Sequence, residues 1–372
     1  MKLQLPNLNT IRLIAASMVL VNHAEHFKEH TYFTSLWRVP AIMQMGRLGV
    51  VMFFVLSGFL ITYLLIAEEK ITGNIAVKDF YIRRVLRIWP LYFLILILGF
   101  FVIPNLSFFT ESSVRDAFYE NSSLKLAFFV FIMPNVVAAI FGFDNWSLFN
   151  PIWSIGVEEQ FYLFWPLLFK RKKWNKKWIV ISIIVGYFLL KTLLTFLPQT
   201  PIVVHLRDFI YLFTIDCMAI GSLLAILFVE KHKIIEQLLF KKWFQWIIFP
   251  LTILMIIKGV YFPSIQSQVY AILFGIIILN LALNENRIFN IDTKATKYLG
   301  KISYGIYMYH SIMVFLCIKL FQSMGWHSTL LLELSFFAST FLIAALSYEF
   351  LETYFIKLKL KFSKIVSGDN AK

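Results

Sequence analysis

The sequence predicts an all-α protein that crosses a membrane many times, with both termini in the cytoplasm. Of its 372 residues, 59% are hydrophobic and only 15% are charged, whereas charged residues make up about 25% of an ordinary soluble domain. Apolar runs long enough for a spanning helix recur along the whole chain. Lys and Arg cluster in every second connection between these runs, which is the positive-inside pattern of membrane proteins.

We expect about ten membrane-spanning helices. They are predicted at 8–27, 45–67, 88–104, 153–169, 177–197, 207–229, 243–260, 268–285, 301–322 and 328–350. The connections after the second, fourth, sixth, eighth and tenth spans hold 24 Lys and Arg between them, counting the helix ends, and the alternate connections hold 4. This bias places the basic connections and both termini in the cytoplasm.

The apolar segment 123–141 is expected to be a re-entrant or interfacial helix. If it crossed the membrane, the basic cluster at 170–177 would lie outside, and every later connection would be inverted. The connection 105–152 is then long, which is typical of a lid or a vestibule. The whole chain, 1–372, is predicted to be one membrane domain, with a core at 5–355 and a basic cytoplasmic tail at 356–372.

The charge and the cysteines exclude other classes of function. The net charge of +14 does not indicate nucleic-acid binding, because the cationic side chains lie in short clusters between spans. Cys217 and Cys317 both fall in apolar segments, so we expect buried thiols and neither a disulfide framework nor a metal site. A cleaved signal peptide is not expected, because the first apolar stretch carries Arg12 and His23.

Arg12 and His23 lie inside the first predicted span, where burying an unpaired ionisable group costs several kcal/mol. At about 100° and 1.5 Å per residue, eleven residues make roughly three helical turns and 16–17 Å. The two side chains therefore share one helix face, with Arg12 near the cytoplasm and His23 toward the outer half. This arrangement suggests that a ligand with a charged end at Arg12 reaches chemistry at His23.

Two more motifs lie within the second predicted span and at the cytoplasmic entry to the third. Ser57 and Gly58 are small residues that allow a helix or a slim substrate chain to approach closely, and ordinary helix packing is the simpler interpretation. Arg83, Arg84 and Arg87 precede the third span. Guanidinium groups suit phosphate, but basic residues at such a place also set topology and contact anionic lipid. Both interpretations stay open.

The entry to the fourth span carries Trp153, Ser154, Glu158 and Glu159. Ser154 and Glu158 are four residues apart and share a helix face. They either begin the helix as an approximate capping pattern, or Glu158 orients His23 or holds a substrate hydroxyl.

Two further ionisable side chains lie deep in later spans. His310, six residues after Tyr304, is a second intramembrane imidazole, and a structural role is the simpler interpretation. Asp216 lies inside the sixth span and therefore needs a partner.

The order of these motifs resembles the acyltransferase-3 family of integral-membrane O-acyltransferases over residues 5–355. The motifs are Arg-x10-His, FFVLSGFL, RRxxRxxP, WSxxxEEQFY, the span with Asp216, and SYxxYxxH. The resemblance implies transfer of an acyl group, usually acetyl, from cytoplasmic acetyl-CoA to a hydroxyl of an envelope glycan or another acceptor. Some members carry an added esterase-like domain, which is not expected here. One departure is Tyr354, which stands where the family often has the proline of Glu-x-Pro.

The resemblance implies that His23 is the catalytic histidine and that Arg12 helps the arginine cluster to bind acyl-CoA. We expect the CoA phosphates at these arginines, the pantetheine arm beside Ser57 and Gly58, and the thioester near His23. His23 would act as a general base oriented by Glu158, or form a covalent acyl-histidine. Residues expected to support the site or contact the acceptor are Trp153, Ser154, Glu159, Asp216, Tyr304 and His310.

The expected partners are acyl-CoA as donor substrate, a glycan or other hydroxyl acceptor and the lipid bilayer of the cell membrane, with no permanently bound cofactor. The alternative is a proton-coupled transporter or flippase of a glycan or lipid, because intramembrane His, Asp and Glu also serve proton relays. No inverted repeat is evident in the sequence, and the alternative gives the arginine cluster no purpose.

Overall fold

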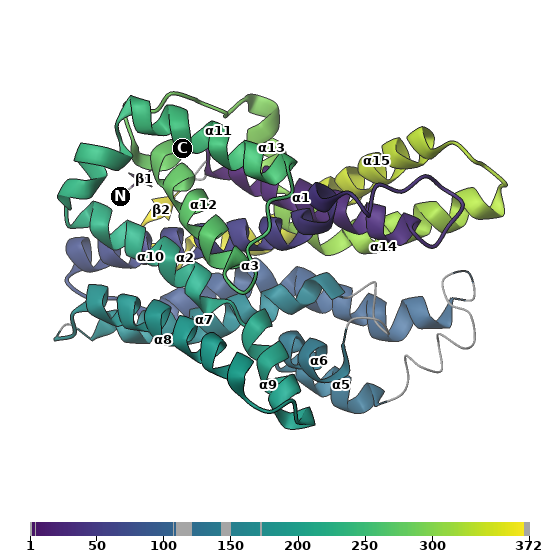
Figure 1. Cartoon of the computed structure of the whole chain (residues 1–372), viewed down its shortest axis with the longest axis horizontal. Coiled ribbons are helices and arrows are strands. Elements are labelled where there is room, and N and C mark those ends of the chain that lie inside the picture. The colour runs from purple at the N-terminus through teal and green to yellow at the C-terminus, as the bar shows by residue number, and fades with distance from the viewer. Residues whose placement is uncertain are drawn as a thin grey trace.

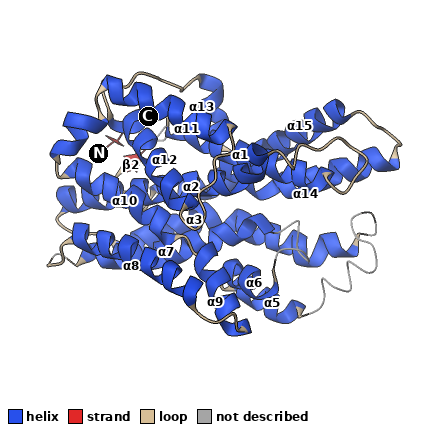
Figure 2. Ribbon diagram, in the orientation of Figure 1, coloured by secondary structure: helices blue, strands red, loops and turns tan. Residues whose placement is uncertain are grey.

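The computed structural model describes residues 2–3, 5–106, 108, 121–142, 150–171 and 173–367. Helices make up about four fifths of this part of the chain (Figure 2). Its only strands are the two-residue segments β1 (Lys2–Leu3) and β2 (Val366–Ser367), which pair in parallel. The first and last described segments therefore lie side by side at one end of the bundle (Figure 1).

Seven helical segments of the described chain are long and apolar enough to cross a membrane. They are α2 (Pro40–Thr72), α3 (Val77–Ile97) with its extension through η1 (Leu98–Val102) and η2 (Ile103–Asn105), α8 (Lys176–Phe196), α9 (Pro201–Leu212) with α10 (Ile215–Val229), α12 (Gln266–Leu283), α14 (Ser303–Ser323), and α15 (Thr329–Ser347) with η6 (Tyr348–Glu352) and α16 (Thr353–Leu360). The prediction of an all-α multi-pass protein is confirmed.

Three other predicted spans are occupied by helices that are too short, not apolar enough or too rich in charged residues to count as membrane-spanning. They are α1 (Leu8–Lys28), α7 (Trp153–Lys170) and α11 (Lys242–Ile257). The count of ten, and the side on which the termini lie, stay predictions. The remaining helical pieces are short: η4 (Asn150–Ile152), η5 (Ile235–Leu239) and α13 (Lys294–Lys301).

The segment expected as one re-entrant or interfacial helix forms two helices, α5 (Ser122–Val130) and α6 (Pro134–Phe141). The break follows from Pro134, because the residue before a proline avoids helical geometry, and Ile132 has a φ of 57°. At 1.5 Å per residue, each helix rises roughly 12–14 Å, less than half of a bilayer core. Residues 109–120 and 143–149 of the expected lid or vestibule lie outside the described residues.

Local sequence sets several helix boundaries. The side chains of Asn175, Thr200, Thr293 and Ser328 each accept a hydrogen bond from a backbone N–H three residues ahead, at the starts of α8, α9, α13 and α15. Such N-caps satisfy donors that have no partner within the helix. Gly73 ends α2 with a φ of 73°, a left-handed conformation that favours glycine.

α2 is the centre of the bundle, and α1, α10 and α12 pack against it. The contact between α2 and α10 is close enough to require glycine on both helices. A Cβ on Gly58 would lie 1.9 Å from the carbonyl oxygen of Met218, and a Cβ on Gly221 would lie 2.1 Å from that of Val55. Gly58 therefore serves helix packing, as the simpler interpretation of its motif has it.

We expect Gly58→Ala to lower the melting temperature of the detergent-solubilised protein markedly, because the added methyl group meets a backbone atom that cannot move aside. The matched control is Gly186→Ala in α8, where a Cβ would meet nothing within 4 Å. This control replaces a mid-helix glycine with a better helix former and should keep or raise the melting temperature. Equal melting temperatures for Gly58→Ala and the wild type would contradict the close packing.

Candidate functional site

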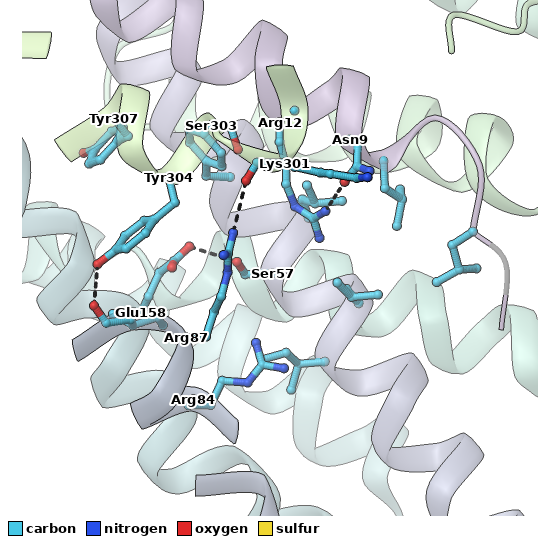
Figure 3. A pocket seen from close by; sticks show the side chains of 18 of the residues that line it. Asn9, Arg12, Ser57, Arg84, Arg87, Glu158, Lys301, Ser303, Tyr304 and Tyr307 are labelled. Carbon is cyan, nitrogen blue, oxygen red and sulfur yellow. Dashed lines mark hydrogen bonds between the residues drawn. The ribbon is translucent and has the colours of Figure 1, made fainter. Parts of the chain in front are cut away.

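A cavity of about 570 Å³ lies between α1, α2, α3, α7 and α14, and residues near both chain ends, including Leu5 and Lys359, also line it (Figure 3). Its walls are strongly cationic. Two carboxylates, Glu158 and Asp292, face it together with seven cationic side chains: Arg12, Arg84, Arg87, Arg287, Lys297, Lys301 and Lys359. Such a surplus of positive charge suits a ligand with several negative groups.

The cavity changes character along its length. At one end, the ring of Tyr307 packs edge-on against Phe53 with centroids 5.7 Å apart, and its hydroxyl lies 2.7 Å from Ser154 Oγ. All three of these neutral side chains line the cavity. Figure 3 shows Tyr307 well separated from Arg84 and Arg12. The cavity therefore combines a polycationic part with an uncharged end.

The arginine cluster, which lies within the first half of α3, is divided by the fold. Arg84 and Arg87 line the cavity, whereas Arg83 does not. Arg83 donates through Nη1 to the carbonyl oxygen of Phe362 at 2.7 Å and through Nη2 to Glu68 Oε2 at 3.3 Å. These contacts tie α3 to α2 and to the C-terminal segment, and contact of Arg83 with a ligand stays a prediction.

The arginines in the cavity wall differ in whether their hydrogen-bond donors already have partners within the protein. Arg87 pairs with Glu352 Oε2 at 3.2 Å, and Arg12 donates to Asn9 Oδ1 at 2.8 Å. The Nε of Arg84 is buried without a hydrogen-bond partner among the described residues, while its guanidinium group lies 5.5 Å from the ring centre of Tyr162. A buried donor without a partner is costly, and an anionic ligand would satisfy it.

Glu158 lines the cavity and is hydrogen-bonded both to α2 and within its own helix, α7. Its Oε1 accepts a hydrogen bond from Ser57 Oγ at 2.8 Å, and its Oε2 accepts one from the Tyr162 hydroxyl at 3.2 Å. The structure places His310 against His23, whereas Glu158 is hydrogen-bonded to Ser57 and Tyr162, so the expectation that Glu158 orients His23 is not supported. The contacts of Glu158 leave it able to hold a substrate group in the cavity.

The neighbours of Glu158 divide between the cavity and the helix packing. Ser154 lines the cavity, as its shared face with Glu158 suggested. Glu159 instead accepts a hydrogen bond from Trp89 Nε1 at 3.0 Å, and Trp153 packs edge-on against Phe54. Neither Glu159 nor Trp153 lines the cavity, so their expected contact with the acceptor is not supported.

His23 and His310 form a pair next to Tyr307, and neither histidine lines the cavity. His23 Nδ1 lies 2.9 Å from His310 Nε2, and the ring centroids are 5.0 Å apart with an angle of 29° between the ring planes. His310 Nδ1 lies 2.6 Å from the carbonyl oxygen of Tyr307, whose side chain lines the uncharged end of the cavity. Arg12 and His23 both belong to α1, as their spacing predicted. The pair joins two motifs that are 287 residues apart in the sequence.

The other predicted site residues have clear structural partners. The Tyr304 hydroxyl donates to the carbonyl oxygen of Ile88 at 2.9 Å while its side chain lines the cavity. Asp216 is fully buried and does not line the cavity; it pairs with Lys191 at 3.2 Å and accepts a hydrogen bond from Gln268 at 2.5 Å. The prediction that Asp216 needs a partner is confirmed, but a role in binding the acceptor is not supported.

Sequence reasoning missed six residues of the wall that have charged or amide side chains: Asn9, Arg287, Asp292, Lys297, Lys301 and Lys359. Lys359 belongs to α16, within the stretch predicted as a basic tail, and the packing of α16 against α3 brings it to the cavity. The basic charges were visible in the sequence only as topological signals.

Comparison with known proteins gives a consistent family assignment. Residues 5–349 match the family model of an acyltransferase domain. The peptidoglycan O-acetyltransferase OatA of Listeria monocytogenes is 28% identical over 340 residues, which are 83% of this chain and 51% of that protein. The putative acetyltransferase ORF330 of Acidianus two-tailed virus is 24% identical over 290 residues, 76% of this chain and 78% of that protein.

A putative O-acetyltransferase of Staphylococcus aureus (strain COL) is 29% identical over 180 residues, 44% of this chain and 24% of that protein. The chain thus spans about half of the Listeria relative and about a quarter of the staphylococcal one. No solved structure matches it. The family model covers nearly the whole chain and the motifs stand in the expected order, and the chain therefore belongs to the acyltransferase 3 family.

Proposed function

We propose that this protein is an O-acyltransferase of the plasma membrane. It takes an acyl group, most simply acetyl, from cytoplasmic acyl-CoA and transfers it to a hydroxyl of an acceptor on the other side. The observation that carries the proposal is one cavity whose polycationic part leads to an uncharged end beside a histidine pair. The name of the Listeria relative, a peptidoglycan O-acetyltransferase, supports an envelope glycan as the acceptor.

The cavity suits the chemical layout of acyl-CoA. The phosphates of the nucleotide are placed at Arg12, Arg84, Arg87 and the neighbouring lysines, where charge-assisted hydrogen bonds are strongest. The uncharged pantetheine arm then passes Ser57 and Glu158. The small acyl group lies at Phe53, Ser154 and Tyr307, where the wall carries no charge. The rise of 16–17 Å from Arg12 to His23, at about 1.5 Å per residue, is comparable with the reach of the arm.

The histidine pair supplies the acid–base chemistry of the transfer. His23 takes the proton of the acceptor hydroxyl as the hydroxyl oxygen attacks the thioester carbonyl carbon. A new C–O bond forms, the C–S bond breaks, and the proton passes from His23 to the departing CoA thiolate. The reaction yields an acyl ester and free CoA without net release of a proton.

The test is binding of acetyl-CoA to the detergent-solubilised protein, measured by isothermal titration calorimetry. Loss of one hydrogen bond to a charged group costs about 1.5–3 kcal/mol, so Arg84→Ala and Arg87→Ala should each weaken binding roughly 10- to 100-fold. The matched control is Arg171→Ala, because Arg171 is exposed at the end of α7 and does not line the cavity. It should bind acetyl-CoA as the wild type does.

Two results would overturn the proposal. One is the absence of acetyl-CoA binding by the wild type, as expected of a transporter. The other is an unchanged affinity in Arg84→Ala and Arg87→Ala. Mass spectrometry of envelope glycans from cells with and without the protein then tests the acceptor, since the acetyl increment should disappear when the protein is removed.

A further inference from the structure

The geometry points to a second histidine that acts on the reaction without touching the substrate. We infer that His310 is a positioning residue that fixes the tautomer of His23 and so leaves His23 Nε2 free to act as a base. This inference rests on the proposed function and assigns His310 a role that its motif does not reveal.

Hydrogen-bond chemistry fixes the protons of the pair when both rings are neutral. The carbonyl oxygen of Tyr307 can only accept, so His310 Nδ1, at 2.6 Å, must be the protonated nitrogen of its ring. His310 Nε2 then carries a lone pair and accepts. His23 Nδ1, at 2.9 Å, must therefore donate to it, which leaves the lone pair of His23 on Nε2.

The surroundings of His310 keep its proton on Nδ1. Its side chain is only 1% exposed, so water cannot replace the carbonyl of Tyr307 as its partner. The Ser311 hydroxyl lies 3.2 Å from His310 Nε2, and a hydroxyl at this place also donates to the lone pair. Both contacts favour Nε2 of His310 as an acceptor.

Tyr307 links the histidine pair to the donor cavity. Its backbone carbonyl oxygen accepts a hydrogen bond from His310 Nδ1, while its side chain lines the uncharged end of the cavity. Its hydroxyl donates to the carbonyl oxygen of Pro151 at 2.6 Å, so Ser154 donates to the Tyr307 oxygen at 2.7 Å. One residue of α14 thus places the donor and, through His310, orients the base.

The two histidines carry the same protons before and after the reaction. When His23 Nε2 takes the hydroxyl proton, the resulting imidazolium still donates through Nδ1 to the lone pair of His310, which stabilises the positive charge. His23 then returns the Nε2 proton to the CoA thiolate. His310 keeps its own proton on Nδ1 throughout and exchanges none with the substrate.

The experiment compares His310→Ala with His310→Gln in the full-length protein. Alanine removes the acceptor, whereas the glutamine side-chain oxygen can still accept from His23 Nδ1. The matched control is Tyr309→Phe. Tyr309 is on α14 beside His310, and the change removes its buried hydrogen bond to Ser347 of α15 but leaves the histidine pair intact. The readouts are kcat, KM for acetyl-CoA, and the 15N spectrum of histidine-labelled protein, with His23 assigned by comparison with His23→Gln.

We expect the wild-type spectrum to show His23 protonated at Nδ1. His310→Ala should shift His23 toward protonation at Nε2 and lower kcat by roughly 10²-fold with KM unchanged, within the 10²–10⁴ that a positioned base supplies. His310→Gln should restore much of kcat and the Nδ1 proton, and Tyr309→Phe should resemble the wild type.

Three results would overturn the role of His310: a wild-type His23 protonated at Nε2, unchanged kcat in His310→Ala, or His310→Gln no better than His310→Ala. Failure of the proposed function would look different. The wild type would then neither bind nor transfer acetyl, while the 15N spectrum would still report the geometry of the pair.

Discussion

Replacing His23 with alanine should abolish acyl transfer and leave the binding of acetyl-CoA near that of the wild type. His23 is the only proposed base, and a positioned general base contributes about 10²–10⁴-fold to the rate. Its side chain lies beyond the cavity and contacts His310, so removing it takes away no group that lines the cavity. The effect should therefore fall on kcat, whereas Arg12→Ala at the other end of α1 should weaken donor binding.

Transfer is measured with purified protein and a soluble glycan acceptor, by the release of free CoA and the mass of the acylated product. The matched control is His30→Ala, which removes an exposed histidine just after α1. It should transfer at the wild-type rate. Near-normal transfer by His23→Ala would show that His23 takes no part in the chemistry, whichever ligand the cavity binds.

The largest effect on stability is expected at the buried pair of Lys191 and Asp216. Their side chains are 5% and 0% exposed and join α8 to α10. Lys191→Met leaves the carboxylate of Asp216 buried without its cation, and breaking such a pair costs about 3–5 kcal/mol. The double change Lys191→Met with Asp216→Asn removes both charges and should be markedly less destabilising than the single change.

The stability of each variant is measured by reversible denaturant unfolding in mixed micelles. The control pair is Lys177 and Glu230, which are 2.8 Å apart but partly accessible to solvent, with side chains 28% and 43% exposed. Lys177→Met should change stability by no more than about 1 kcal/mol. Additive effects of the two substitutions at Lys191 and Asp216 would show that the charges do not interact.

Features that depend on one helix were predictable from the sequence. The alignment of Arg12 with His23 and of Ser154 with Glu158 follows from helix periodicity, and the structure keeps each pair on one helix. The all-α multi-pass fold follows from apolar runs that only a helix can carry through a bilayer. These inferences need no knowledge of how the helices pack.

Features that depend on packing were not predictable. The sequence could not show that Arg83 faces away from the cavity, because its carbonyl partner, Phe362, is 279 residues distant. It also could not show that His310, and not Glu158, meets His23. Both are intramembrane groups that need a partner, and only the approach of α14 to α1 decides between them.

The division of the cavity into a polycationic part and an uncharged end has a consequence for regulation. On the proposed function, the cations hold the nucleotide, which acyl-CoA and spent CoA have in common, so these contacts bind substrate and product alike and do not accelerate the chemistry. Only the surface at Phe53, Ser154 and Tyr307 meets the group by which the two differ. Free CoA is then a competitive product inhibitor, and the rate of acylation outside the membrane follows the ratio of acyl-CoA to free CoA in the cytoplasm.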